Sequence, residues 1–458
     1  LKKETTPDGG KDENVFQIRQ GVAIALYVKN KRAKKTTVYH TDLYGIRKEK
    51  FNWLNNNKLT VKNYTKIQPR SPYYFFIRRK TEQIQHYLKW KKINEIFPVN
   101  GVGITTARDK FVIDFDISSV ENRIRRFKNS KYDDKTLHEF FQIPKKKGWD
   151  IRKAWNMLQP LSDSEMHELI QTITYRPFDN RYIFWHDSVV WRTVKRIMQH
   201  MLKENIGIIV PRQFKEEPGA YIAENIIGHK TVSAYDINYL FPLYLYPKAK
   251  KNNPRSASTI MMVFDETETY GKQPNIAPFI FEKLCGSFGT KASPEDIFYY
   301  IYGVFYSTIY RETYGEYLKI DFPRVPFTSD YTLFKKIGDL GKKLADLHLL
   351  KATAIDKPIA KCPIAGPENR IEKISYNQDE QRIYFNKDKY FDGVVPEVWK
   401  YHIGGYQVLH KYLKDRKGRE MGEASHYCRI ITAVSKTITI QQQIDDIYPE
   451  IELNFLNF

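Results

Sequence analysis

The chain has 458 residues, of which 41% are hydrophobic and 14% aromatic, including 32 Tyr and 27 Phe. So many large apolar side chains exclude a disordered polypeptide and predict a packed fold of two or three domains. Lys and Arg number 74 against 53 Asp and Glu, which gives a net charge of +21. A polyanion, with nucleic acid as the first candidate, is therefore the expected partner, although charge alone neither separates DNA from RNA nor excludes an inert basic surface.

The cysteines argue for a reducing cytoplasm. Cys285, Cys362 and Cys428 are far apart and form no CxxC pair, so neither a disulfide framework nor a zinc site is expected. No apolar stretch approaches the ~20 residues of a membrane span, and no signal peptide is recognised, so no membrane partner is expected. The first residue is Leu, and the polar run over residues 2–14 is typical of a cut rather than a natural start.

Residues 1–80 are predicted to form the edge of a sheet. Residues 15–29 contain the apolar run GVAIALYV, which is typical of a strand buried on both faces. Residues 36–40 (TTVYH) form a second short strand, so the two strands predict an antiparallel hairpin, and a helix is expected over residues 45–54.

Residues 81–270 are predicted to mix short strands, helices and loops. The expected elements include a strand in FVIDF, helices within residues 117–158, a helix capped by Asp163, a strand-turn-strand unit over residues 174–185, a basic amphipathic helix over residues 191–203, a buried strand over residues 206–213, and a solvated loop over residues 248–256.

Residues 271–458 change to helical periodicity. Helices are expected over residues 276–284, 294–318 with a break near Ser307, 331–350, 396–413 and 425–447, with strands and turns over residues 371–390. The fold class is therefore α+β, with a mixed, β-rich domain followed by a helical domain.

No catalytic or cofactor motif is recognised. Adenine methylation needs a glycine-rich turn after a strand and an Asn/Asp-Pro-Pro-aromatic loop, but GSFG (286–289) follows a predicted helix and NNPR (252–255) lacks the second proline and the aromatic residue. Asp114 and Asp116 could share a face and hold Mg²⁺, but no ExK partner follows, which favours structural roles. His229 and His348 have no metal-ligand spacing, and we expect no metal site, catalytic residue or bound cofactor.

Polar and basic side chains on loops beside strands are the candidates for DNA contact. Their residue types suit phosphates and base edges. The candidates are Thr105, Thr106, Arg108 and Lys110 in TTARDK, Arg192, Lys195 and Arg196 on the basic helix, Arg212 and Gln213 in PRQ, and Lys230. Two alternatives stay open: TTARDK could be an exposed hairpin loop with an Arg108–Asp109 pair, and the basic helix could be an ordinary solvated face.

Several ordered blocks resemble the C-terminal target-recognition region of type ISP and related fused type II (type IIG) restriction-modification enzymes. The blocks are INEIFPVNGVGITTARDKFVID, YRPFDNRYIFW, IGIIVPRQ, INYLFPLYLYP, GKKLADLHLL and VPEVWKYHIGGYQVLHKYLKDRKGR. The resemblance implies a parent enzyme that methylates adenine N6 with S-adenosylmethionine and selects its site through this region. It also implies that residues 15–29 are a remnant of the Rossmann-type methyltransferase sheet, and that methyltransferase, nuclease or helicase domains lie upstream.

Three hypotheses about function follow. The leading one is sequence-specific recognition of duplex DNA for a restriction-modification N6-adenine methyltransferase, without catalysis by this chain. The second is a self-contained enzyme that modifies or cleaves DNA. The third is an RNA-binding or interaction scaffold, suggested by aromatic residues such as Tyr73, Tyr74, Trp185 and Trp191 near basic ones.

Overall fold

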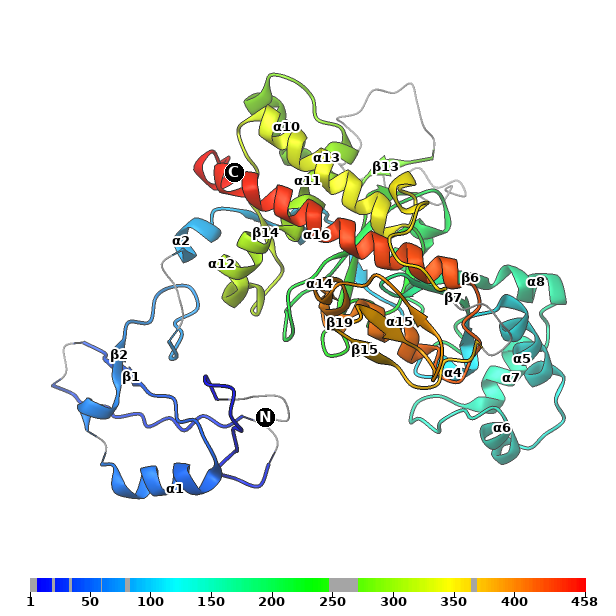
Figure 1. Cartoon of the computed structure of the whole chain (residues 1–458), viewed down its shortest axis with the longest axis horizontal. Helices are drawn as coiled ribbons and strands as arrows, with labels where there is room; N and C mark the ends of the chain where they lie inside the picture. The colour runs from blue at the N-terminus through cyan, green and yellow to red at the C-terminus, as the bar shows by residue number, and fades with distance from the viewer. Residues whose placement is uncertain are drawn as a thin grey trace, which may run out of the picture. The chain divides into compact units, whose positions relative to one another are not determined.

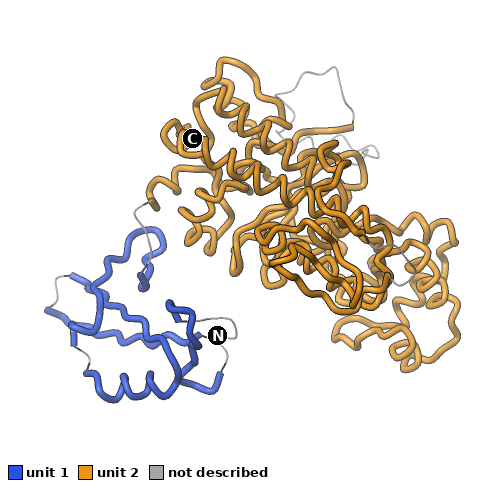
Figure 2. Tube along the Cα trace, in the orientation of Figure 1, with its two compact units in different colours: residues 1–82 blue, residues 83–458 orange. Residues whose placement is uncertain are grey.

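The computed structural model describes residues 6–18, 21–32, 35–58, 60–78, 83–246, 271–363 and 369–458 (Figure 1). The chain divides into two compact units, unit 1 over Leu1–Glu82 and unit 2 over Gln83–Phe458 (Figure 2). The three-domain division expected from the sequence stays a prediction, and the solvated loop expected over residues 248–256 lies outside the described residues. No helix in the described ranges is both long and apolar enough to cross a bilayer.

Unit 1 pairs two short strands around a helix. Strand β1 (Val38–His40) pairs antiparallel with β2 (Thr65–Ile67), and helix α1 (Arg47–Asn56) and a 3-10 helix (Val61–Asn63) lie between them in sequence. Asp12 anchors this helix, because it accepts a hydrogen bond from the Gly45 N–H at 2.9 Å and pairs with the Lys50 ammonium at 2.7 Å. The expected helix is therefore present, displaced by two residues.

The strand predicted within residues 15–29 is not formed. Residues 21–30 have no regular secondary structure, and Ile24, Leu26 and Val28 are 76%, 71% and 81% exposed. An all-apolar strand needs neighbours that cover both of its faces, and the described part of unit 1 offers only the β1–β2 pair. The predicted hairpin is wrong for the same reason, and the described residues of unit 1 do not show a remnant of a Rossmann-type sheet.

Two four-stranded sheets form the first half of unit 2, with strand orders β10-β6-β7-β5 and β4-β11-β8-β9. All neighbours are antiparallel except the parallel pair β10–β6. The strands are β4 (Gly101–Val102), β5 (Ile113–Asp114), β6 (Ile170–Arg176), β7 (Asp179–Phe184), β8 (Gly207–Pro211), β9 (Tyr221–Ala223), β10 (Ile226–Ile227) and β11 (Asn238–Pro242). The β6–β7 hairpin and the fully buried β8 confirm two of the predictions.

Short helices accompany these sheets, and α5 to α8 gather beside the β6–β7 hairpin (Figure 1). The helices are α2 (Ile84–Tyr87), α3 (Ile93–Ile96), α4 (Asp109–Val112), α5 (Ile117–Asn129), α6 (Asp134–Phe140), α7 (Ile151–Leu158), α8 (Asp163–Glu168) and α9 (Lys195–Met198), the last continued by a 3-10 turn (Gln199–Leu202).

Three sequence-based boundaries in this half need correction. FVIDF is half helix and half strand, since α4 ends at Val112 and β5 begins at Ile113. Ser162, not Asp163, caps α8, because its hydroxyl accepts the Glu165 N–H. The basic helix begins only at Lys195, since Val194 has a φ of 50° in the left-handed region and cannot continue a helix.

The second half of unit 2 is mainly helical. Its long helices are α10 (Pro278–Phe288), α11 (Pro294–Tyr306), α12 (Thr308–Leu318), α13 (Tyr331–His348) and α16 (Ala424–Leu453), with a 3-10 turn at Thr353–Ile355. The predicted break near Ser307 is confirmed, since Ser307 ends α11 and caps α12 through a hydrogen bond from the Tyr310 N–H.

Residues 396–413 do not form the single helix that was expected. They contain α14 (Pro396–Lys400), the hairpin of β18 (His402–Ile403) with β19 (Tyr406–Gln407), and the start of α15 (Val408–Asp415). The remaining strands are the sheet β15 (Ser375–Asn377), β16 (Arg382–Tyr384), β17 (Tyr390–Phe391) and the pairs β12 (Tyr244–Leu245) with β13 (Gln273–Pro274) and β3 (Lys91–Lys92) with β14 (Arg324–Val325).

The core of this half contains many buried tyrosines, and several of their hydroxyls make hydrogen bonds inside the protein. Helices α11, α13 and α16 pack side by side (Figure 1). Tyr300 and Tyr306 are fully buried and donate to the Pro326 and Ala220 carbonyls at 2.5 and 2.8 Å. Tyr302 contacts Nδ1 of the buried His348 at 2.7 Å. Hydrogen bonds of this kind offset the cost of burying a hydroxyl, whereas the buried Tyr448 hydroxyl has no such partner among the described residues.

Candidate nucleic-acid interface

An open cleft of about 770 Å³ lies beside β5, β7, α5 and α6 in unit 2. Its charged side chains are five cations and two acids. The cations are Lys110, Arg123, Arg126, Arg181 and Arg419, and the acids are Asp109 and Asp114. Phe115, Phe140, Phe141 and Tyr175 add aromatic surface. A cleft in which cations outnumber acids attracts an anion, and its aromatic walls can support planar groups.

The turn from β5 into α5 positions one wall of this cleft. Asp116 caps α5 by accepting the Ser119 N–H at 2.8 Å, so the helix starts directly after Phe115. Arg123 and Arg126 lie three residues apart and therefore on neighbouring faces of α5. The Arg126 guanidinium lies 5.2 Å from the Phe140 ring of α6.

Phe115 collects three guanidinium groups around its ring. Arg181 of β7 lies 4.0 Å from the ring centroid. Arg416 and Arg419 lie at 4.6 and 4.5 Å, and both belong to the C-terminal segment, by which we mean α15 and the residues after it up to Glu420. Such contacts hold guanidinium groups in place through the negative face of the ring. The C-terminal segment therefore takes part in the cleft although it follows β5 by some 300 residues.

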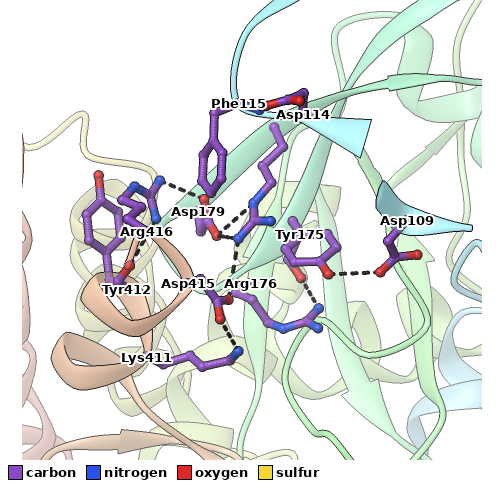
Figure 3. A network of polar contacts seen from close by, with 11 residues as sticks. Asp109, Asp114, Phe115, Tyr175, Arg176, Asp179, Lys411, Tyr412, Asp415 and Arg416 are labelled. Atoms are coloured by element: carbon purple, nitrogen blue, oxygen red, sulfur yellow. Dashed lines mark hydrogen bonds and ion pairs between the residues drawn. The ribbon is translucent and has the colours of Figure 1, made fainter. Parts of the chain in front are cut away.

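A buried network of ion pairs ties the C-terminal segment to the β6–β7 hairpin (Figure 3). The Asp179 carboxylate is 1% exposed and accepts from Arg181 at 2.6 Å and from Arg416 at 2.8 Å. Asp415 accepts from Arg181 at 3.3 Å and from Lys411 at 2.5 Å. Since each carboxylate bridges two cations, the hairpin and α15 are held in one arrangement.

Asp114 of β5 likewise bridges two cations of the cleft, one on α5 and one in the C-terminal segment. It pairs with Arg123 and, at 3.1 Å, with Arg419. Burial acts to raise the pKa of Asp114, but the hydrogen bonds from the Phe115 N–H and from Arg123 leave it below its ordinary value. The carboxylate is therefore ionised and engaged with arginines. Among the described residues no group of three or more His, Cys, Asp or Glu could hold a metal ion. The ion pairs of Asp114 and the helix cap formed by Asp116 are structural roles, as expected for both residues.

The TTARDK candidates divide between the cleft and the interior. Lys110 is exposed and lines the cleft, and Thr105 is half-buried. Thr106 is 4% exposed and donates to Asp109. Arg108 is 3% exposed, with its guanidinium 3.6 Å from the Trp149 ring and donating to the Val189 carbonyl at 3.0 Å. Burial lowers the pKa of Arg108 to about 10.

This arrangement revises both interpretations of TTARDK. The segment is not an exposed hairpin loop, because it leads into α4, and no Arg108–Asp109 ion pair is found in this described segment. Instead Asp109 also accepts the Tyr175 hydroxyl at 2.8 Å. Thr106 and Arg108 support the loop from inside, which leaves Lys110 and Thr105 as the residues that a ligand could reach.

The basic helix candidates keep their exposure. Thr105 and Arg192 are joined by main-chain hydrogen bonds, so the two loops lie side by side. Arg192 is exposed and has no ion-pair partner among the described residues. Lys195 pairs with Asp187 at 2.5 Å, and Arg196 reaches the Asn100 carbonyl at 3.5 Å. The predicted apolar side is confirmed by the burial of Ile197, Met198 and Met201.

The last three candidates lie outside the lining of the cleft and have internal partners. The exposed Arg212 pairs with Asp321 at 2.9 Å, and the Gln213 amide donates to the Ile320 carbonyl at 2.8 Å. The Lys230 ammonium donates to the Tyr235 carbonyl at 2.8 Å, and burial lowers its pKa. Their contact with DNA stays a prediction.

Sequence reasoning missed most of the cleft. Arg123, Arg126, Arg181, Arg419 and Phe115 were not among the candidates. The run NRIRRF on α5 carried a usable signal, since its arginines alternate with the residues Ile124 and Phe127 that face the core. No local signal points to Arg419, because its partners come from distant parts of the chain.

The GSFG motif does not have the geometry of a turn that holds S-adenosylmethionine. The GSFG glycines close helix α10, where Gly289 is the C-cap with a φ of 67°, so they present the carbonyl end of a helix rather than a turn after a strand. NNPR lies outside the described residues.

The fold and the cleft define a mixed α/β protein with a cationic surface for an anionic partner. Residues 95–444 match the type ISP C-terminal specificity domain, and the chain belongs to this family. No curated protein sequence matches it.

Three solved structures share the fold. A nuclease-deletion mutant of the type ISP restriction-modification enzyme LlaGI, in complex with a DNA substrate mimic, is 19% identical with a TM-score of 0.61 over 90% of this chain and 33% of that one. The ATP-dependent type ISP enzyme LlaBIII bound to DNA is 17% identical with a TM-score of 0.63 over 88% and 27%. The DrdV–DNA complex is 18% identical with a TM-score of 0.62 over 91% and 43%. The chain thus spans less than half the length of each.

Proposed function

We propose that this chain recognises the target sequence in duplex DNA on behalf of a restriction-modification enzyme. The observation that carries the proposal is the cleft, in which cations outnumber acids and in which Lys110 and Arg126 have no acidic partner among the described residues. Membership in the specificity-domain family supports it, as do the three similar proteins, which were solved with DNA or a substrate mimic.

The chemistry of the cleft suits the backbone of a duplex. Lys110 and Arg126 neutralise phosphates, which supplies affinity without sequence preference. Sequence is read by side chains that reach base edges, and the exposed Arg192 with the neighbouring, half-buried Thr105 offers donors for this task. The candidates Lys195, Arg196, Arg212, Gln213 and Lys230 would have to leave their present partners to do so.

The rest of the proposal concerns the enzyme to which the chain would belong. We infer an N6-adenine methyltransferase of the type ISP or type IIG kind, which uses S-adenosylmethionine bound by a domain that residues 1–80 adjoin. A nuclease, and for the type ISP kind a helicase, would complete it, in the cytoplasm. The larger size of the three similar enzymes supports this arrangement.

Selection of bound sequences from a random pool of duplexes tests the proposal. We expect enrichment of one sequence and an affinity that falls steeply with salt, because each phosphate contact releases counterions. Lys110→Gln and Arg126→Gln should each lower the slope of log K against log salt by about 0.9. A flat selection together with salt-independent binding would refute the proposal, and preference for single-stranded RNA as competitor would favour the scaffold hypothesis.

A further inference from the structure

We propose that Arg419 binds a backbone phosphate of the duplex and that Asp114 and Phe115 position its guanidinium group for this contact. The inference rests on the proposed function and assigns a binding residue to the C-terminal segment. That segment was expected to belong to a separate helical domain.

The Arg419 side chain is both fixed and accessible. It is 52% exposed and lines the cleft. One nitrogen, Nη2, contacts the Asp114 carboxylate at 3.1 Å, and the planar group lies 4.5 Å from the Phe115 ring. A guanidinium carries five N–H donors, so one ion pair leaves most of them available for an anion in the cleft.

The backbone of Arg419 is held as firmly as its side chain. Its N–H donates to the Arg416 carbonyl at 3.0 Å, and its carbonyl accepts the Ile371 N–H at 2.9 Å. The next residue, Glu420, forms a β-bridge with Arg370. Because the backbone and the guanidinium group of Arg419 are both held in place, the side chain loses little conformational entropy when it binds phosphate. This favours tight and oriented contact.

The other three arginines near Asp114 and Phe115 donate to acceptors inside the protein. The Arg181 side chain is 11% exposed and pairs with Asp179 and Asp415. The Arg416 side chain is 14% exposed, pairs with Asp179 and donates to the Tyr412 carbonyl. Arg123 is 23% exposed, pairs with Asp114 and donates to the Phe111 and Ile113 carbonyls. Of these four arginines, Arg419 combines exposure with unused donors, so it is the one placed to take a ligand.

The test compares Arg419→Gln with Lys342→Gln in the full chain. Lys342 is a matched control, because its side chain is 55% exposed, pairs with one carboxylate at 2.9 Å and contacts an aromatic ring, yet does not line the cleft. Affinity for a labelled duplex would be measured over a range of salt concentrations, with thermal melting as the check on folding.

Arg419→Gln should weaken binding about tenfold and lower the salt slope by about 0.9, while Lys342→Gln changes neither. Arg419→Lys should restore the slope but only part of the affinity, since an ammonium lacks the planar fork. Asp114→Asn should weaken binding in the wild-type chain but not in the Arg419→Gln chain, a dependence that general loss of stability would not produce.

Two results would overturn the proposal at different levels. If the wild-type chain binds duplex DNA and Arg419→Gln has the same affinity and slope as Lys342→Gln, the assignment of Arg419 is wrong and the proposed function stands. If the wild-type chain shows no salt-dependent binding to duplex DNA, the proposed function fails and the role of Arg419 fails with it.

Discussion

Replacing Asp179 by Asn should destabilise unit 2 strongly, because this carboxylate carries the network between the β6–β7 hairpin and α15. Asp179 is 1% exposed, and the side chains of its partners Arg181 and Arg416 are 11% and 14% exposed. The substitution removes the negative charge that both guanidinium groups pair with, while the two groups stay almost fully buried. Arg181 keeps Asp415 at 3.3 Å, whereas Arg416 keeps only uncharged partners.

Breaking a buried ion pair by removing one partner costs about 3–5 kcal/mol. We expect about 3 kcal/mol for Asp179→Asn, because the amide oxygen still accepts one hydrogen bond and Arg181 keeps a second carboxylate. Asp346→Asn is the control, since it removes an i,i+4 partner from Lys342 on the surface of α13, a pair of a kind that contributes about 0.3–0.5 kcal/mol.

Urea unfolding of both variants and of the wild type, followed by circular dichroism, measures the difference. A double variant with Arg416→Gln should be about as stable as Asp179→Asn alone, because removing both charges leaves no buried cation without its carboxylate. The ion-pair network does not have the proposed role if the free energy of unfolding of Asp179→Asn lies within about 1 kcal/mol of that of the Asp346→Asn control. The same follows if the losses of stability in Asp179→Asn and Arg416→Gln simply add in the double variant.

Three further predictions concern the helical half. Burial lowers the pKa of His348 to about 3. Below about pH 6.5 this histidine is therefore protonated in the unfolded chain but still neutral in the folded chain, which favours unfolding. Melting temperatures should fall between about pH 6.5 and pH 4.5, and they should fall less for His348→Gln. Gly341→Ala would place a Cβ 1.9 Å from the Tyr299 carbonyl oxygen, so it should force α13 from α11 and cost about 1–3 kcal/mol in urea unfolding. Ser307→Ala removes the cap of α12 and a bond to Asp445 at 2.7 Å, which should lower the free energy of unfolding by about 1–2 kcal/mol in the same assay, whereas no change would contradict the capping role.

The sequence predicted those elements whose signals are local. The β6–β7 hairpin, the buried β8 and the break at Ser307 each follow from a short pattern of apolar, turn or capping residues. The hairpin β18–β19 also had a local signal, the Gly404-Gly405 pair, whose first residue has a φ of 57° and suits a tight turn. We did not predict it because the flanking helical pattern dominated.

Elements that depend on distant partners were not predictable. Residues 21–28 have the composition of a central strand, but composition does not supply the neighbouring strands. Arg108 was expected to reach a ligand, and it is buried because Trp149 and Val189 supply an aromatic face and a carbonyl. In each case the side chain's environment, not its type, decides its role.

The candidate site shows the same limit. Lys110 was predicted because it stands in a conspicuous polar loop. Arg419 lies in a run of charged residues that predicts only a solvated surface, and it enters the cleft through Asp114, which is 305 positions away in the sequence. Charge composition predicts an anionic partner, but only the tertiary structure brings the cations of the cleft together.

The long sequence separations within the ion-pair network have a consequence for the order in which the protein is made. Asp114 and Asp179 leave the ribosome some 240 to 300 residues before Arg419 and Arg416, the partners that complete their pairing. Until then β5 and the β6–β7 hairpin hold carboxylates that are not fully neutralised, so their final packing has to wait for the C-terminal segment. A truncated chain that stops before Arg416 would thus expose this region to proteases.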